Sequence, residues 1–169
     1  MPDEFDGYLR LDGVTSECKD PDHPEWIDVE SFSFGCSVSD FAIGQDGKLV
    51  ADDADVTPVT FTSGFHKGSP TIFQFCVTGK QIATADFHAR TAGGTPFTYL
   101  IIKLEDCLIT SVSNSNSGGP LPTETITLAY RKITVQYNEQ DTKTGQAATG
   151  GTVTIAYDQA ENAEEEESG

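Results

Sequence analysis

Residues 26–38 read WIDVESFSFGCSV, and this stretch decides the fold class of the chain. Small residues recur at every second position as Ser31, Ser33, Gly35 and Ser37, and the positions between them are apolar. Because successive side chains of a strand point to opposite faces of a sheet, this alternation predicts one strand over 26–38. One of its faces packs on a core, and the other presents a small, uncharged, hydroxyl-rich surface.

The same reasoning predicts further strands along the chain. They cover residues 5–12, 56–63, 81–90, 99–112, 123–137 and 152–157. A single short helix begins at Ser69-Pro70, with Ser69 as its N-cap, and ends at Gly79. A change of apolar parity between Tyr130 and Ile133 predicts a β-bulge near Arg131. About eight strands and one helix favour an all-β fold, a twisted β-barrel or a two-sheet β-sandwich.

Residues 39–55 form the longest irregular stretch that the sequence predicts before the C-terminal region. Apolar residues are scattered among its aspartates and glycines: Phe41, Ile43, Leu49 and Val50. Structureless loops longer than about 12–15 residues are uncommon in a compact domain and are often functional. We therefore expect a long protruding loop, and its apolar residues argue against simple disorder.

The charge balance of the chain limits the classes of partner that it can bind. The chain has 10 basic and 27 acidic residues, for a formal net charge of −17. Such a surface repels phosphate backbones and anionic lipids, so we expect neither nucleic-acid binding nor membrane insertion. No apolar run approaches about 18 residues, and the acidic N-terminus lacks the apolar core of a signal peptide. We expect folding in the cytoplasm and, if the protein is exported, a route other than the general secretory one.

The remaining composition suggests one domain with a tail. Residues 1–158 form a single β-barrel domain, and residues 159–169 form an acidic, disordered tail around the run 164–167. The four cysteines, Cys18, Cys36, Cys76 and Cys107, include no CxxC pair. Two disulfides are conceivable in an exported protein, but small buried thiols are the simpler interpretation.

No pattern of catalytic or metal-binding residues stands out. The histidines His23, His66 and His88 lie in different predicted elements without zinc-ligand spacing, and His23 suits a loop anchor. The sequence contains no GxSxG and no phosphate-binding GxxxxGK[ST] motif. Carboxylates are numerous, but nothing singles out one catalytic pair. We expect no cofactor, no metal and no enzymatic activity.

Ordered blocks of the chain resemble the haemolysin-coregulated protein family, which forms the tube of the type VI secretion system. They are EWIDVESFSFG at 25–35, ADFHARTAGG at 85–94, residues 61–70 and 99–113, TETITL at 123–128 and ITVQY at 133–137. The similarity runs in order from about Phe5 to Asp158. Each block alone is weak, and the ordered set is specific.

The resemblance implies a function in assembly. It implies hexameric rings that stack head to tail into a tube, surrounded by a contractile sheath, tipped by a spike protein, carrying small effectors in its lumen, and secreted or injected into a target cell. The loop near 38–56 would contact a neighbouring subunit through Asp40, Phe41, Ile43, Gln45, Leu49, Val50 and Val56. Ser31, Ser33 and Ser37 would line the lumen.

Three alternatives stay open. The chain could be the tube protein of a phage-tail-like contractile device. It could be a hydrolase on a β-scaffold, which predicts a deep pocket with converging carboxylates of perturbed pKa. It could also be a barrel-shaped adaptor, which predicts a monomer in solution.

Overall fold

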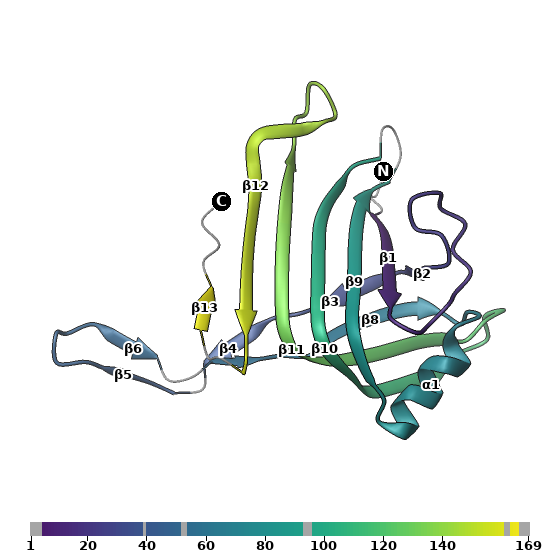
Figure 1. The fold of residues 1–169 in the computed structure, drawn as a ribbon, viewed down its shortest axis with the longest axis horizontal. Coiled ribbons are helices and arrows are strands. Elements are labelled where there is room, and N and C mark those ends of the chain that lie inside the picture. Colours follow the sequence, from purple (N-terminus) through teal and green to yellow (C-terminus); the bar gives the residue numbers. More distant parts are fainter. Residues whose placement is uncertain (1–4, 39, 52–53, 93–95, 161–162, 166–169) are drawn as a thin grey trace.

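The computed structural model describes residues 5–38, 40–51, 54–92, 96–160 and 163–165. Thirteen strands and one helix lie in these ranges (Figure 1). Their bounds are β1 Phe5–Leu11, β2 Ile27–Val29, β3 Ser31–Ser33, β4 Cys36–Val38, β5 Phe41–Ile43, β6 Leu49–Ala51, β7 Ala54–Val56, β8 Val59–Gly64, α1 Ser69–Thr78, β9 Gln81–Thr91, β10 Thr98–Ser115, β11 Thr123–Gln140, β12 Ala147–Asp158 and β13 Ala163–Glu165. No helix of the described residues is both long and apolar enough to cross a membrane.

The strand ladders close into a barrel. The main antiparallel sheet has the order β13-β12-β11-β10-β9-β1-β2, and β11 pairs with β8 through its first half and β12 through its second. The run 27–33 pairs with β1 through β2 and with β8 through β3, and the Glu30 N–H donates to the Thr62 carbonyl at 2.7 Å. Together these pairings form a closed circuit of strands in the order β1, β9, β10, β11, β8 and 27–33, and the last of these pairs again with β1. The predicted all-β barrel is confirmed.

One hydrophobic core fills this barrel. Its largest buried side chains come from β1, β8, β9, β10, β11 and α1, and include Leu9, Phe61, Phe87, Ile102, Leu128 and Ile72. These are the apolar positions of the alternating strand patterns, which is why period-two reasoning located most of the strands. The core therefore follows directly from the sequence.

The predicted bulge near Arg131 is wrong. Buried positions do change parity there, but the register runs unbroken from Glu105↔Lys132 to Cys107↔Tyr130. Both strands turn the same corner of the sheet together, so neither gains an extra residue. The register shift between β10 and β11 lies instead between Ile109 and Ser111.

The helix prediction holds with one change. Helix α1 begins at Ser69, but the N-cap residue is Gly68, and the Ser69 hydroxyl accepts a hydrogen bond from the His66 N–H at 3.0 Å. At the other end Gly79 takes a left-handed φ of 65°, which glycine adopts without a steric penalty. Ile72 and Phe75 bury one side of the helix against the barrel.

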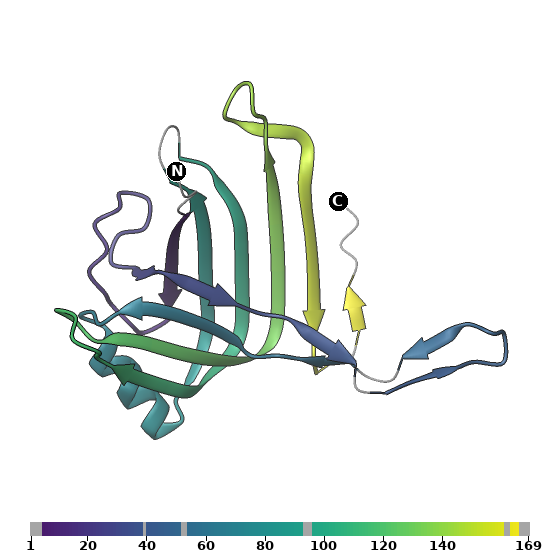
Figure 2. The same ribbon diagram turned by 180° about the vertical axis from the view of Figure 1, so that it is seen from behind.

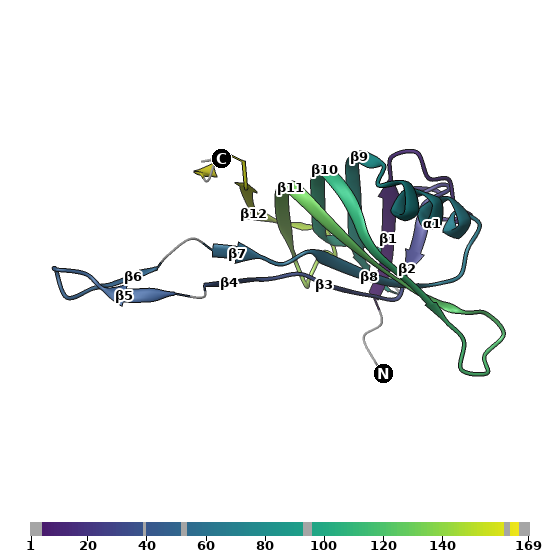
Figure 3. The same cartoon turned by 90° about the horizontal axis from the view of Figure 1, so that it is seen from below.

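The predicted single strand over 26–38 is divided into β2, β3 and β4. Beyond the barrel, β4 pairs with β7, and β5 pairs with β6. These strands form a two-stranded arm, residues 36–56, that projects away from the barrel (Figures 2 and 3). Among the described residues of the stretch 39–55, which was expected to be irregular, 41–43, 49–51 and 54–55 are therefore paired strand. The ladders give their backbone groups partners within the chain in place of water.

Part of the acidic tail is also paired. Ala163–Glu165 forms β13 on the free edge of β12, with Ala156 opposite Glu165, although an unstructured chain is expected there. The open backbone groups at the edge of a sheet make such pairing favourable. Residues 161–162 and 166–169 of the predicted tail lie outside the described residues.

Candidate functional site

The arm exposes apolar side chains on both of its faces. Phe41 and Ile43 are 71% and 73% exposed, and Leu49, opposite Ile43, is 70% exposed. Val50 projects from the other face of the ribbon, because it is paired with Ala42. A ribbon of two strands cannot bury both faces by itself. The chain's own fold therefore leaves these apolar side chains exposed.

The other predicted interface residues occupy different places along the arm. Asp40 and Gln45 are exposed, beside and beyond β5. Val56 lies at the base, opposite Cys36, and packs in part against the chain's own core. The structure thus brings Phe41, Ile43 and Leu49 onto one face and places Val56 apart from them.

A second exposed apolar surface, which the sequence analysis missed, continues the core-facing side of the sheet onto β12. The register aligns Ile102 with Val135 and Ile155, and Leu100 with Tyr137 and Val153. Ile102 is fully buried, whereas Ile155 is 63% exposed at the far end of its row. We call Tyr137, Val153 and Ile155 the β12 patch. In the sequence, the alternation of Val153, Ile155 and Tyr157 indicates a strand with one apolar face. The sequence does not show that this face is left uncovered by the rest of the fold.

A third surface is a field of hydroxyl groups. Across β3, β8, β11 and β10 two rows run side by side: Ser31, Thr62, Thr125, Ser113 and Ser33, Thr60, Thr127, Ser111. The core side chains Phe32, Phe61, Ile126 and Val112 fill the opposite face. None of the eight residues carries a charge. We call this surface the hydroxyl face.

The hydroxyl face contains two of the three predicted lumen residues. Ser31 and Ser33 belong to it, but Ser37 lies in β4, opposite Asp55 of the arm. The break between β3 and β4 separates Ser37 from the barrel surface. The threonines at 60, 62, 125 and 127 were missed, although their spacing of two within two predicted strands was the signal for them.

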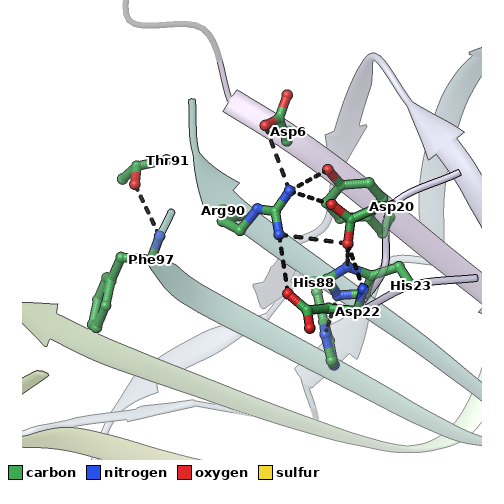
Figure 4. Close-up of polar contacts among 9 residues, drawn as sticks. Asp6, Asp20, Asp22, His23, His88, Arg90, Thr91 and Phe97 are labelled. Carbon is green, nitrogen blue, oxygen red and sulfur yellow. Dashed lines mark hydrogen bonds and ion pairs between the residues drawn. The ribbon is translucent and has the colours of Figure 1, made fainter. Parts of the chain in front are cut away.

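A buried ionic cluster anchors the segment between β1 and β2 (Figure 4). Arg90 Nη2 donates to Asp20 Oδ2 at 2.6 Å and to the Tyr8 hydroxyl at 2.7 Å. Burial acts to raise the pKa of Asp20, but hydrogen bonds from Arg90, His23 and the Asp22 N–H outweigh it and hold that pKa far below its usual range. His23 also binds Asp20, which confirms it as a loop anchor. This cluster is structural in character.

The geometry does not resemble that of a hydrolase. A cavity of about 220 Å³ beside Arg10, Asp12 and Trp26 is lined by the end of β1 and by the chain that follows β1 and precedes β2. The carboxyl groups with shifted pKa values in the described ranges, Asp20 and Asp158, are ion-paired to Arg90 and Arg131, and both shifts are downward. Paired, ionised carboxylates of this kind are typical of structural ion pairs. The described residues contain no group of three or more side chains that could hold a metal.

The comparison with known sequences points the same way. Residues 8–137 match the family described as "Type VI secretion system effector, Hcp". The protein hcp1 of Pseudomonas aeruginosa is 34% identical over 159 residues, which cover 93% of this chain and 96% of that protein.

Solved structures share the fold over nearly their whole length. A type six secretion system protein has a TM-score of 0.85 at 26% identity, covering 95% of this chain and 99% of its own. Hcp1 from Salmonella typhimurium has a TM-score of 0.78 at 26% identity, with the same coverage of 95% and 99%. A type VI secretion system effector from Yersinia pestis has a TM-score of 0.70 at 27% identity, covering 90% and 99%.

Proposed function

This chain belongs to the Hcp family of the type VI secretion system, whose members are structural tube proteins and not enzymes, and we propose that it forms hexameric rings that stack head to tail as the inner tube. The exposed arm carries this proposal. Its apolar residues lie on a ribbon that projects away from the barrel, so a neighbouring copy is the surface that covers them (Figure 3).

The β12 patch is the complementary surface on the same chain. Among the described residues, no ladder joins β5 or β6 to β12 within one chain. In the proposal, the arm of one copy covers the patch of the next, in a head-to-tail manner. Such a heterologous contact gives a ring when its rotation closes, and it also allows rings to be stacked. Burial of apolar area contributes about 25 cal/mol per Å², and the exposed side chains on both surfaces supply that area.

The hydroxyl face is the proposed wall of the lumen. Its rows, which begin at Ser31 and Ser33, offer hydrogen bonds without charge, so small effectors of differing composition pass or lodge there. Ser37 belongs to the arm and is not part of this proposed wall. The sheath around the tube and the spike at its tip are the remaining partners that the proposal requires.

Export follows from the same role. The protein folds in the cytoplasm, needs no signal peptide, and leaves the cell with the tube. Residues 1–158 act as the tube domain, and 159–169 are an appendage whose paired part, β13, lies outside the barrel circuit.

Size-exclusion chromatography with light scattering tests the proposal. The wild type is expected near six subunits, and the double variant Phe41→Asp/Ile43→Asp as a monomer with an unchanged circular dichroism spectrum. Phe73→Asp, a charge at an exposed apolar residue on the outer side of α1 and away from the arm, is the matched control and should leave the oligomer intact. A folded wild type that stays monomeric at every concentration, or a double variant that still forms rings, contradicts the assembly proposal.

A further inference from the structure

The segment 12–26 is held on the outer face of β1 and β9 by two imidazole rings (Figure 4). His23 Nε2 lies 2.9 Å from His88 Nδ1, and His23 Nδ1 lies 2.9 Å from Asp20 Oδ1. His23 is only 4% exposed. We propose that this pair is an acid-sensitive latch: it accommodates one added proton, and a second added proton releases residues 18–26 from the barrel.

The hydrogen bonds determine how many protons the pair can hold. The Asp20 carboxylate accepts the Nδ1–H of His23, so the Nε2 of a neutral His23 accepts the Nδ1–H of His88. One added proton still leaves a single N–H between the rings, whichever ring carries the charge. A second added proton places an N–H on both facing nitrogens, and two donors at 2.9 Å cannot bond to each other.

The surroundings leave little solvent around His23, whereas His88 is half-buried. His23 stacks on Tyr8 with ring centroids 4.1 Å apart, and Trp26 lies 4.8 Å from His23 and 4.9 Å from His88. Burial, and next the charge of His23, lower the pKa of His88, while Asp86 opposes them. An aromatic enclosure of this kind penalises an additional cation.

Charged groups from every packed element act on the pair. The carboxylates are Asp20 and Asp22 from the segment, Asp6 from β1, Asp28 from β2 and Asp86 from β9, and the cations are Arg10 from β1, Arg90 from β9 and Lys103 from β10. Tyr8 and Cys18 are further ionisable groups beside the pair. The carboxylates favour uptake of the first proton. Arg90 and the first imidazolium together disfavour the second.

A second imidazole contact, at His66, lies beside the latch on the same segment. The Gly68 N–H donates to His66 Nδ1 at 3.1 Å, so the Ser16 hydroxyl, 2.8 Å from the same nitrogen, is a donor. The Nε2 of His66 lies 3.2 Å from the buried carboxylate of Glu124. This contact joins the chain at Ser16, outside the residues 18–26 that the latch releases.

The expected effect has a definite size. The open segment binds both protons below the ordinary histidine pKa of about 6.5, whereas the closed segment holds one. Linkage then raises the opening equilibrium by up to about tenfold per pH unit below that value. Opening is local, because the barrel ladders of β10 and β11 contain neither ring.

Hydrogen exchange between pH 8 and pH 5, corrected for the intrinsic pH dependence of exchange, tests the latch. The reporters are the amides of Cys18, Glu25 and Trp26, which bond to the carbonyls of Trp26, Cys18 and His23. Their protection in the wild type should fall by up to about tenfold per pH unit below about 6.5, while β10 and β11 keep theirs. The fluorescence of Trp26, the single tryptophan, gives a second readout.

Two variants sharpen the test. His88→Asn places a non-titrating amide where Nδ1 stands and should remove the pH slope. Asp22→Asn changes an exposed charge near Arg90 without touching a ring and should keep it. The latch is overturned if wild-type segment and barrel lose protection together, if neither loses it, or if His88→Asn keeps the wild-type slope. Should His88→Asn not fold, the wild-type comparison of segment and barrel still decides.

Discussion

Asp106 and Arg131 form an ion pair, with Nε 2.6 Å from Oδ2, at the corner where β10 and β11 turn together. Asp106 takes a left-handed φ of 51°, a conformation that aspartate tolerates better than most residues. Arg131 also donates to the buried carboxylate of Asp158 at the end of β12. One arginine thus ties the corner of the barrel to its outermost long strand.

Replacing Arg131 by Met should lower the thermal unfolding midpoint. The change removes the guanidinium that donates to Asp158, and a buried carboxylate that loses such a partner destabilises the fold. Thermal unfolding followed by circular dichroism measures the shift. Arg10→Met is the control, since Arg10 is 45% exposed in its pair with Asp86 and such surface pairs contribute little. Equal shifts for the two variants would show that the corner contact is unimportant.

Asp20→Asn should make stability less dependent on pH in the acid range. The pKa of Asp20 is lowered in the folded state, so its contribution is present above the unfolded value of about 3.9 and is lost as the pH falls below it. Urea unfolding at pH 7, 4 and 2.5 should show the variant less stable than the wild type at pH 7, with a smaller difference at pH 2.5, where part of the Asp20 contribution has been lost. A constant difference at all three values would contradict this assignment.

Phe61→Ala should cost about 3–5 kcal/mol of unfolding free energy, because Phe61 is buried in the barrel and its loss leaves a cavity. Urea denaturation of the arm double variant as background measures this cost without interference from assembly. Phe73→Ala, on the outer side of α1 and 56% exposed, is the matched control. Its expected cost is below about 1 kcal/mol.

The sequence predicted features that depend on neighbours along the chain. Strands such as 81–90 show their period of two directly, and the glycine at 79 marks the end of α1. The arm was predicted as a protrusion, but its pairing was not, since β4 finds its partner β7 across a stretch rich in Asp and Gly. Residue order alone does not reveal that ladder.

Surfaces that combine distant strands required the register. Ser31 and Ser33 were predicted from one strand, whereas their neighbours Thr62 and Thr125 join them only through β8 and β11. His23 and His88 are 65 residues apart and meet because β1 pairs with β9. Local patterns carry no information about such contacts.

Thiol labelling should distinguish the exposed cysteine from the buried ones by their rates of modification. The structure has no disulfide among them, and Cys36 is exposed, which corrects the expectation that the thiols are all buried. Burial, and next the charge of Asp106, raise the pKa of Cys107 to about 12. A thiol reagent at pH 8 should therefore modify Cys36 first and leave Cys107 unmodified until the chain unfolds. Rapid labelling of Cys107 in the folded protein would contradict its burial.

Ile155→Asp should weaken assembly and leave the barrel folded. Ile155 is 63% exposed in the β12 patch, so a carboxylate there stays hydrated in the monomer but would have to be desolvated under the arm of a neighbouring copy. Thr154→Asp is the matched control, because the adjacent residue of the same strand projects from the opposite face. Sedimentation velocity should show dissociated subunits for Ile155→Asp and intact oligomers for Thr154→Asp. If the pattern is reversed, the opposite face of β12 forms the contact, and the arm requires a different acceptor.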